Sequence, residues 1–297
     1  MNVDNYLDEK LEADKKPNDK PYKDGAAYTG KEHSWDEGFG YFGAAANTAR
    51  LSAKDTYQVA KRGKKSDPAS ALALADYNHD GKVDYAKEMT YALAYYAAAY
   101  DKGGKTNYLH TINQAFLDGR HLITNANGEK LSDAERSQLK GYADVVKSNL
   151  EKVLAESVFK YAGSSYKDLQ KLQTALDSGG DTDKILHDYV KHWGELKGFS
   201  MSLQMGGKDL GEAALRLNRL IGFGPVLANS SQVIDVDSAG NYVKDQGSGL
   251  GEYSMHMLKV QKLMVDEFGV QARSNDQMGS MAALSESLGD GDSAEND

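Results

Sequence analysis

The chain has 297 residues, of which 35 are Lys or Arg and 44 are Asp or Glu, and its formal net charge is −9. This acidic balance excludes a general nucleic-acid or anionic-membrane binder, because no basic excess is present to neutralise phosphates. The absence of Cys excludes disulfides, thiolate metal sites and Cys nucleophiles. A hydrophobic content of 40% fits a folded core, and the low count of four Pro favours helices.

Both ends of the chain are polar. Residues 1–24 contain two Pro and charges of both signs, and we expect a flexible lead-in there. Residues 272–297 are expected to form an acidic flexible tail. No apolar run reaches the roughly 18 residues that a membrane span requires, and no signal peptide is visible. The residues between the ends, 25–271, are expected to form one all-helical domain.

Helix signals follow one another through this middle region. Pro68 suits a first helical turn and predicts a helix that runs to Asp76. Ser132 followed by Glu135 is a capping box that opens a long helix. Further helices are expected over about 85–100, 106–123, 164–177, 182–205, 208–221 and 251–268, and a long loop with one short strand at 232–236 over 225–250. Because no series of alternating strands is present, the sequence predicts an all-α helical bundle.

A pattern typical of calcium loops separates the first two of these helices. Residues 76–88 read DYNHDGKVDYAKE, with oxygen-bearing side chains at alternate positions and a Gly for the sharp turn. Position 12 is Lys87 in place of the Glu of an EF-hand, and the nearest Glu comes one residue later. The predicted Ca²⁺ ligands are Asp76, Asn78, Asp80, Lys82 through its carbonyl, Asp84 and Glu88. The alternative is a turn that caps the second helix through Asp84.

The only two Trp of the chain occupy the same short pattern. Trp35 lies in HSWDEGFGYF and Trp193 lies in HWGELKGF, so both segments read Trp-x-Glu-x-x-Gly-aromatic after a preceding His. The two segments are about half a chain length apart, which predicts two related helical halves, about 25–160 and 161–271. Gly40 and Gly198 are expected to let another backbone approach closely.

Each Trp segment also carries His and carboxylate side chains three or four residues apart, a spacing that places them on one helix face. If the two helices face each other, two imidazoles and several carboxylates converge, and this ligand set suits iron, zinc or manganese. The candidate metal ligands are His33, Asp36, Glu37, Asp188, His192 and Glu195. The alternative is packing, with the Trp in the core and the His and Glu side chains in buried hydrogen bonds.

These segments resemble the imelysin-related proteins of the bacterial cell envelope. The resemblance is carried by the segments EHSWDEGFGYFG and KHWGELKGF and covers residues 32–43, 76–101 and 187–205. The two segments are most similar to an uncharacterised, imelysin-like group of envelope lipoproteins. The resemblance implies an all-helical fold of two similar halves with a His-x-x-Glu motif. It also implies export to the periplasm, outer membrane or cell surface, a link to iron regulation and a metal site.

Three hypotheses about function follow. The first is an envelope protein that handles iron or zinc, with a metal ion or metal-bearing ligand, or another envelope protein, as its partner. The second is a non-enzymatic binding or adhesion module that calcium stabilises. The third is a metallopeptidase, an activity attached to imelysin itself, although the chain has no His-Glu-x-x-His helix. No residue is singled out as catalytic, and neither nucleic acid nor a transmembrane segment is expected.

Overall fold

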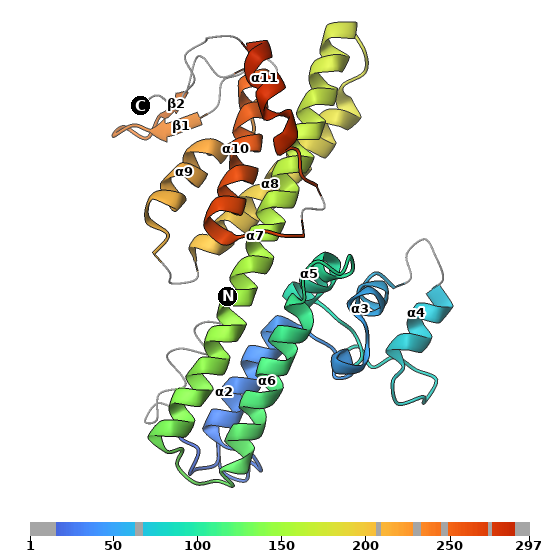
Figure 1. Cartoon of the computed structure of the whole chain (residues 1–297), viewed down its shortest axis with the longest axis vertical. Helices are drawn as coiled ribbons and strands as arrows, with labels where there is room; N and C mark the ends of the chain where they lie inside the picture. The colour runs from blue at the N-terminus through green and yellow to red at the C-terminus, as the bar shows by residue number, and fades with distance from the viewer. Residues whose placement is uncertain are drawn as a thin grey trace. The chain divides into compact units, whose positions relative to one another are not determined.

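The computed structural model describes residues 16–62, 68–205, 209–227, 233–244, 249–272 and 275–288. The predicted all-α class is confirmed, because ten α-helices and one two-stranded hairpin make up most of the regular structure of these residues (Figure 1). The chain divides into two compact units, Met1–Val153 and Leu154–Asp297. The first 15 residues of the predicted lead-in and the last nine of the predicted tail lie outside the described residues. No described helix is both long enough and apolar enough to cross a membrane.

The first unit is built around α6, which packs against α2, α5 and the 3-10 turn η2. Helix α2 begins with a capping box in which Thr29 and Glu32 exchange side-chain and backbone hydrogen bonds, and it ends at Gly43 with φ of 80°. The elements of this unit are α2 (Gly30–Phe42), η2 (Thr48–Arg50), α3 (Ala53–Ala60), α4 (Pro68–Ala75), α5 (Ala92–Asp101), α6 (Tyr108–Asn125) and the first part of α7 (Asp133–Ser178).

Helix α5 starts later than the sequence predicts. Residues 85–88 form a separate turn, and the backbone N–H of Tyr91 donates to the Gly43 carbonyl at 2.8 Å. A Cβ on Gly43 would lie 2.8 Å from the Tyr91 carbonyl oxygen, so only Gly permits this approach. The tertiary contact with the end of α2 holds Tyr91 in an extended conformation, and the helix therefore begins at Ala92 instead of near residue 85.

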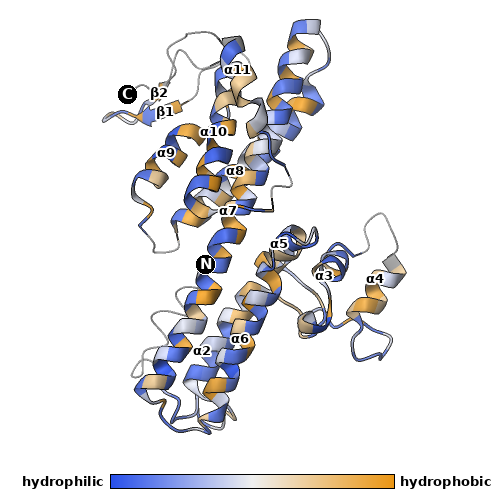
Figure 2. Ribbon diagram, viewed as in Figure 1, coloured by the Kyte–Doolittle hydropathy of each residue, from blue (hydrophilic) through white to orange (hydrophobic). Residues whose placement is uncertain are grey.

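Helix α7 is one continuous helix of 46 residues, where the sequence predicts two. The segment KYAGSSY at 160–166 contains Gly163 and two Ser, and such residues weaken a helix when only local propensity is considered. The helix continues because its flanks are anchored by buried apolar positions, among them Val158, Phe159 and Leu169. In Figure 2 its ribbon alternates between apolar and polar colours along its length, as expected of a helix with one packed side.

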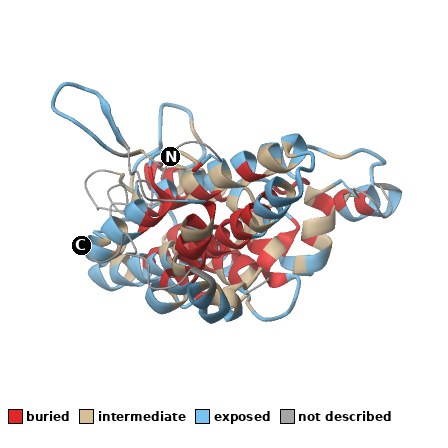
Figure 3. Ribbon diagram, turned by 90° about the horizontal axis from the view of Figure 1, so that it is seen from above, coloured by how far each residue is buried: buried red, intermediate tan, exposed pale blue. Residues whose placement is uncertain are grey.

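The second unit has one contiguous apolar core. Helix α10 packs against α9 and α11, and its buried Tyr253, Leu258 and Met264 join the core positions of α7. The elements are the second part of α7, α8 (Asp183–Gln204), α9 (Gly211–Ile221), β1 (Val233–Val236), β2 (Tyr242–Lys244), α10 (Leu250–Phe268), the 3-10 turn η3 (Met278–Ser280) and α11 (Met281–Leu288). The two antiparallel strands form an exposed hairpin. Figure 3 shows the buried positions as runs along the helices and the loops as exposed.

The described residues that follow α10 form hydrogen bonds to α7, and we name residues 270–272 and 275–278 the strap. Glu156 accepts hydrogen bonds from the backbone N–H groups of Gln271 and Ala272, at 2.9 and 2.8 Å. Asn275 donates to the Lys160 carbonyl at 2.6 Å. Gly163 makes the fit possible, because a Cβ there would lie 2.2 Å from the Asn275 carbonyl oxygen. Part of the predicted acidic tail is thus packed against α7.

Candidate functional site

The loop over residues 76–81 uses its polar side chains to fix its own backbone. Asp76 accepts hydrogen bonds from the backbone N–H groups of Asp80 and Gly81, at 3.1 and 3.0 Å. The amide oxygen of Asn78 accepts from Asp80 N–H at 3.0 Å, and Asp80 accepts from Lys82 N–H at 2.9 Å. Gly81 has φ of 79°, the conformation that the sharp turn requires. The side-chain oxygens at the first, third and fifth loop positions are therefore held by the same short stretch of backbone.

Glu88 closes the loop at its base and is only 2% exposed. One carboxylate oxygen accepts from the N–H groups of Tyr77 and Asn78, at 3.2 and 3.4 Å, and the other accepts from Asp84 N–H at 2.8 Å. A buried carboxylate requires such hydrogen bonds, because burial without them is costly. Glu88 thus joins the two ends of the loop, although it stands one position later than the acidic residue of an EF-hand.

Asp84 and Val83 link the loop to the rest of the first unit. The Asp84 carboxylate accepts from Ala86 N–H at 2.8 Å and caps the short turn over residues 85–88. Val83 packs against a small buried cluster of Val59, Ala75 and Met89. The predicted cap of the second helix through Asp84 is wrong, because α5 begins at Ala92 and has Tyr91 as its N-cap. The second carboxylate oxygen of Asp84 is not used in the short turn and lies 3.5 Å from the Lys87 ammonium.

The first Trp segment forms part of α2. The His33 ring lies 3.7 Å from the Tyr22 ring, centroid to centroid, and its Nε2 is 3.5 Å from Glu37 Oε1. Asp36 accepts a hydrogen bond from Arg120 Nε on α6 at 2.9 Å. The arrangement therefore gives His33 an aromatic neighbour and gives Asp36 a cationic partner, and both partnerships compete with metal ligation.

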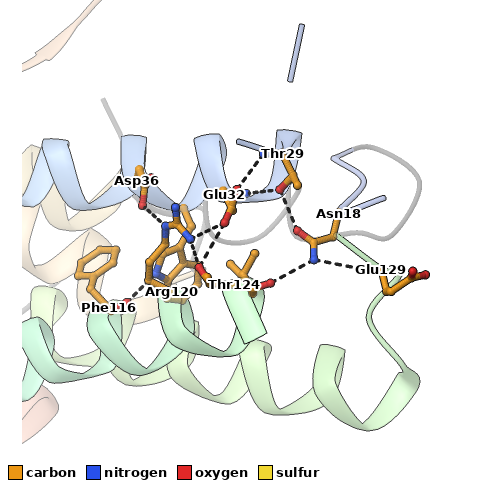
Figure 4. A network of polar contacts seen from close by, with 10 residues as sticks. Asn18, Thr29, Glu32, Asp36, Phe116, Arg120, Thr124 and Glu129 are labelled. Carbon is orange, nitrogen blue, oxygen red and sulfur yellow. Dashed lines mark hydrogen bonds and ion pairs between the residues drawn. The ribbon is translucent and has the colours of Figure 1, made fainter. Parts of the chain in front are cut away.

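Arg120 is the centre of a polar network that links α2 to α6 (Figure 4). Its Nη1 donates to Glu32 at 2.6 Å and also contacts Thr124. The network extends to Asn18, whose amide group donates to the Ile123 carbonyl at 3.1 Å and accepts from Thr29. Asn18 is 2% exposed, so this part of the predicted lead-in is packed.

Two carboxylates bonded to the same guanidinium have pKa values shifted in opposite directions. Burial raises the pKa of Glu32, but the hydrogen bond from Thr29 N–H and the charge of Arg120 outweigh it, so the net pKa is lowered. Burial raises the pKa of Asp36, and Arg120 compensates only in part. Glu32, whose side chain is 12% exposed, is therefore the main acidic partner of Arg120.

The second Trp segment forms part of α8. His192 Nδ1 lies 2.5 Å from Asp168 Oδ2 on α7, and Asp168 is almost fully buried. This pair fixes the orientation of the ring and directs Nε2 away from Asp168. Glu195, one turn further, has a buried Oε2 that accepts no hydrogen bond from any residue the structure describes. Asp188 instead pairs with Lys184 at the surface, where the ammonium competes with any cation.

The six predicted metal ligands are thus distributed over two units, with His33, Asp36 and Glu37 in one and Asp188, His192 and Glu195 in the other. Within the part of the chain that the structure describes, no three His, Asp or Glu side chains are grouped so that they could hold a metal ion. A cation at either place would need amide oxygens, carbonyl oxygens or water as further ligands. The shared site of four or more ligands stays a prediction.

The tight contact that was expected at Gly40 and Gly198 occurs instead at Gly119, where the Trp35 ring lies against the backbone of α6. A Cβ added to Gly40 or Gly198 would meet nothing within 4 Å, so the prediction of close approach at these two positions is wrong. A Cβ on Gly119 of α6 would instead lie 2.1 Å from Cζ2 of the Trp35 ring. Sequence reasoning also missed Asp168 and Arg120, because their partners are distant in the chain. The one local hint was the position of Arg120, a charged residue that comes four residues after Phe116 on an apolar helix face.

Comparison with known proteins adds no further assignment. The chain matches no protein-family model, no curated protein and no solved structure. The resemblance to imelysin-related envelope proteins therefore stays a prediction from the segments around the two Trp and from residues 76–101.

Proposed function

We propose that the loop over residues 76–88 binds Ca²⁺ and that the chain is a non-enzymatic, calcium-stabilised binding protein of the cell envelope. The observation that carries the proposal is the buried carboxylate of Glu88, which fixes both ends of a loop rich in oxygen ligands. These hydrogen bonds close the loop at its base, so part of the conformational entropy of binding is lost beforehand, although the acidic side chains must still draw together around the cation.

The ligand chemistry suits calcium better than smaller or softer ions. Ca²⁺ takes six to eight oxygen ligands in flexible geometry. Side-chain oxygens of Asp76, Asn78 and Asp80, the Lys82 carbonyl and the Asp84 oxygen that Lys87 would release would supply five, and water would supply others. Glu88 Oε1 already accepts two N–H groups, but Oε2 accepts only one and retains a lone pair, so Glu88 can serve as a further ligand through Oε2 without releasing the loop.

The expected role is that of a constant structural staple. The loop follows α4, and Val83 packs it against the cluster of Val59 on α3, Ala75 on α4 and Met89, so bound calcium would fix the loop against α3 and α4. Extracellular calcium modules bind with dissociation constants of about 10⁻⁴ to 10⁻³ M, which is sufficient where calcium is abundant. This requirement favours the periplasm or the cell surface, as does the imelysin resemblance.

Thermal unfolding with and without calcium tests the proposal. We expect Ca²⁺ in excess to raise the melting temperature relative to a chelator, and Mg²⁺ at the same concentration to have a much smaller effect. The Asp80→Ala variant should lose the calcium-dependent shift. Asp55→Ala is the matched control, since Asp55 is a half-buried acidic residue of the same unit that lies outside the loop and accepts a hydrogen bond from Ser52, the N-cap of α3. Equal melting of wild-type protein in calcium and in chelator would refute the proposal.

A second candidate function is transition-metal handling of the imelysin type at His192 in the second unit. The observation that favours it is the 2.5 Å contact between Asp168 and His192 Nδ1, since a carboxylate commonly orients a metal-ligating His in this way. Glu195 would add an oxygen ligand, and iron or zinc would be the expected metal.

Metal analysis of protein purified without chelator tests this second function. We expect the iron or zinc content to fall in His192→Ala and to stay unchanged in His187→Ala. His187 is the matched control because it lies on the same helix and its side chain is 79% exposed. Equal metal content in wild-type protein and both variants would exclude a site at His192.

A further inference from the structure

An aromatic surface patch lies where α3 and α5 pack side by side (Figure 1). The rings of Tyr57 on α3 and Tyr95 on α5 are stacked, with centroids 5.7 Å apart and an interplanar angle of 17°. Tyr96 meets Tyr95 edge to face at 5.0 Å. All three rings are partly exposed. We name these Tyr residues, together with the Lys residues described next, the Tyr–Lys face.

Two lysines cover the stacked rings. Lys102 Nζ lies 4.0 Å from the centroid of Tyr57, and Lys61 Nζ lies 4.9 Å from that of Tyr95. The hydrogen bond with Tyr95 raises the pKa of Lys61. Lys54 lies on the same helical face as Tyr57 and Lys61, since these residues are three and four positions apart.

The ammonium groups of this face have no carboxylate partner in the described part of the chain. None of the ion pairs of the described residues includes Lys54, Lys61 or Lys102. The nearby Asp101 is buried, and its two oxygens accept from Thr106 and from Leu109 N–H. Uncompensated cations are unexpected in a chain with a net charge of −9. The sequence is locally basic as well, with six Lys or Arg and one Asp over residues 50–65.

We propose that the Tyr–Lys face binds an acidic polysaccharide, a chain of sugar rings that bear carboxylates. The apolar C–H face of a sugar ring stacks on tyrosine, and its carboxylate pairs with an ammonium group. Binding moves the Lys102 ammonium from the outer side of the Tyr57 ring to a carboxylate, and a sugar ring takes its place. Cation–π contacts at exposed sites are weak enough for this exchange. The inference is independent of calcium binding at the loop.

A polysaccharide fits this face better than a nucleic acid does. Duplex DNA carries one charge per about 1.7 Å, and the acidic remainder of this chain would repel so dense a polyanion. An acidic polysaccharide has at most one carboxylate per sugar ring, so its charge density matches a face with three lysines. Single-stranded nucleic acid also combines stacking with lysine contacts, and the experiment below includes it.

Titration calorimetry of the full chain with hyaluronan oligosaccharides at low salt tests the proposal. We expect binding that weakens as salt increases, and no binding of neutral dextran. The Lys61→Gln/Lys102→Gln double variant should bind at least about tenfold more weakly. Lys184→Gln/Lys262→Gln is the matched control, since both of these lysines are exposed and belong to surface ion pairs.

Several outcomes would overturn the proposal. Hyaluronan binding that is absent, equal to that of dextran or unchanged in the double variant would do so, as would tighter binding of oligothymidylate. Lys61 and Lys102 are also the C-cap residues of α3 and α5. If their role is only to stabilise helix ends, the double variant will melt at a lower temperature but bind hyaluronan as the wild type does.

Discussion

The two Trp segments share a sequence pattern but are used differently in the two units. Trp35 is 1% exposed, and its indole N–H donates to the Phe116 carbonyl of α6 at 2.8 Å. Trp193 is only partly buried, and its N–H donates to the Tyr253 hydroxyl at 2.8 Å and contacts the Ile221 carbonyl at 3.3 Å. In both units the pattern places an indole against a neighbouring helix. The His and acidic residues around it have no common arrangement, because their partners come from different helices.

The largest effect should come from Gly119, which makes room for the Trp35 ring. In Gly119→Ala the new methyl group would overlap the indole, and we expect a loss of about 3 kcal/mol in the free energy of unfolding of the first unit. Denaturant unfolding followed by Trp35 fluorescence in a Trp193→Phe background measures it. Gly198→Ala is the control in α8, and it should be neutral or stabilising by up to about 1 kcal/mol. Comparable losses in both variants would contradict the difference between the two units.

Removal of the indole N–H tests the two Trp directly. We expect Trp35→Phe to lower the free energy of unfolding by about 2 kcal/mol, since it leaves a cavity and removes a buried hydrogen bond. Trp193→Phe should cost about half as much, because the Tyr253 hydroxyl keeps its bond to the Ile221 carbonyl at 2.7 Å. Each single-Trp variant retains a fluorophore in one unit only. A larger loss for Trp193→Phe would reverse our assignment of which Trp is structurally more important.

Acid should weaken the first segment through Glu32. Its pKa is lowered in the folded chain, so Glu32 stabilises the fold above its unfolded pKa of about 4.5, and this contribution is lost as the pH falls through the folded value. The raised pKa of Asp36 acts in the opposite direction and offsets part of the effect. We expect Glu32→Gln to cost about 1 kcal/mol at pH 7 and to become neutral at acid pH. Chemical unfolding at pH 7 and pH 3.5 measures the difference, and a pH-independent cost would contradict it.

The smallest effects should come from two acidic residues near the second Trp segment, Asp188 on α8 and Asp168 on α7. These two side chains differ in burial. Asp188→Asn is expected to cause no measurable change in stability, because Asp188 and Lys184 are exposed. Asp168→Asn should cost about 1 kcal/mol, since its carboxylate is buried and bonded to His192. Thermal unfolding of both variants, followed by Trp193 fluorescence in a Trp35→Phe background, tests this order.

Local features were predictable from the sequence, and features that depend on packing were not. The capping box of Ser132 and Glu135 and the N–H contacts of the loop at 76–88 involve residues a few positions apart, so pattern alone predicts them. The all-α class follows from composition and periodicity in the same way. The Arg120 network could not be predicted, because Arg120 and Glu32 are 88 residues apart and meet only after α2 packs on α6.

The continuity of α7 illustrates the same limit. Gly163 predicts a helix break from propensity, yet its missing side chain is what admits the Asn275 carbonyl against the helix. The close approach at Gly119 has the same character, since its cause is the Trp35 ring of another helix. A Gly that weakens a helix locally can thus be required by a contact that is invisible in the local sequence.

The strap has a consequence for the order of folding. Gln261 on α10 donates to the Phe159 carbonyl, and Asn275 donates to the Lys160 carbonyl, so both amides bind backbone oxygens that reach their final positions only when α7 is helical. We therefore expect the strap to dock after α7 and α10 have formed and paired. Amide hydrogen exchange should show that residues 275–278 open before the helices that hold them.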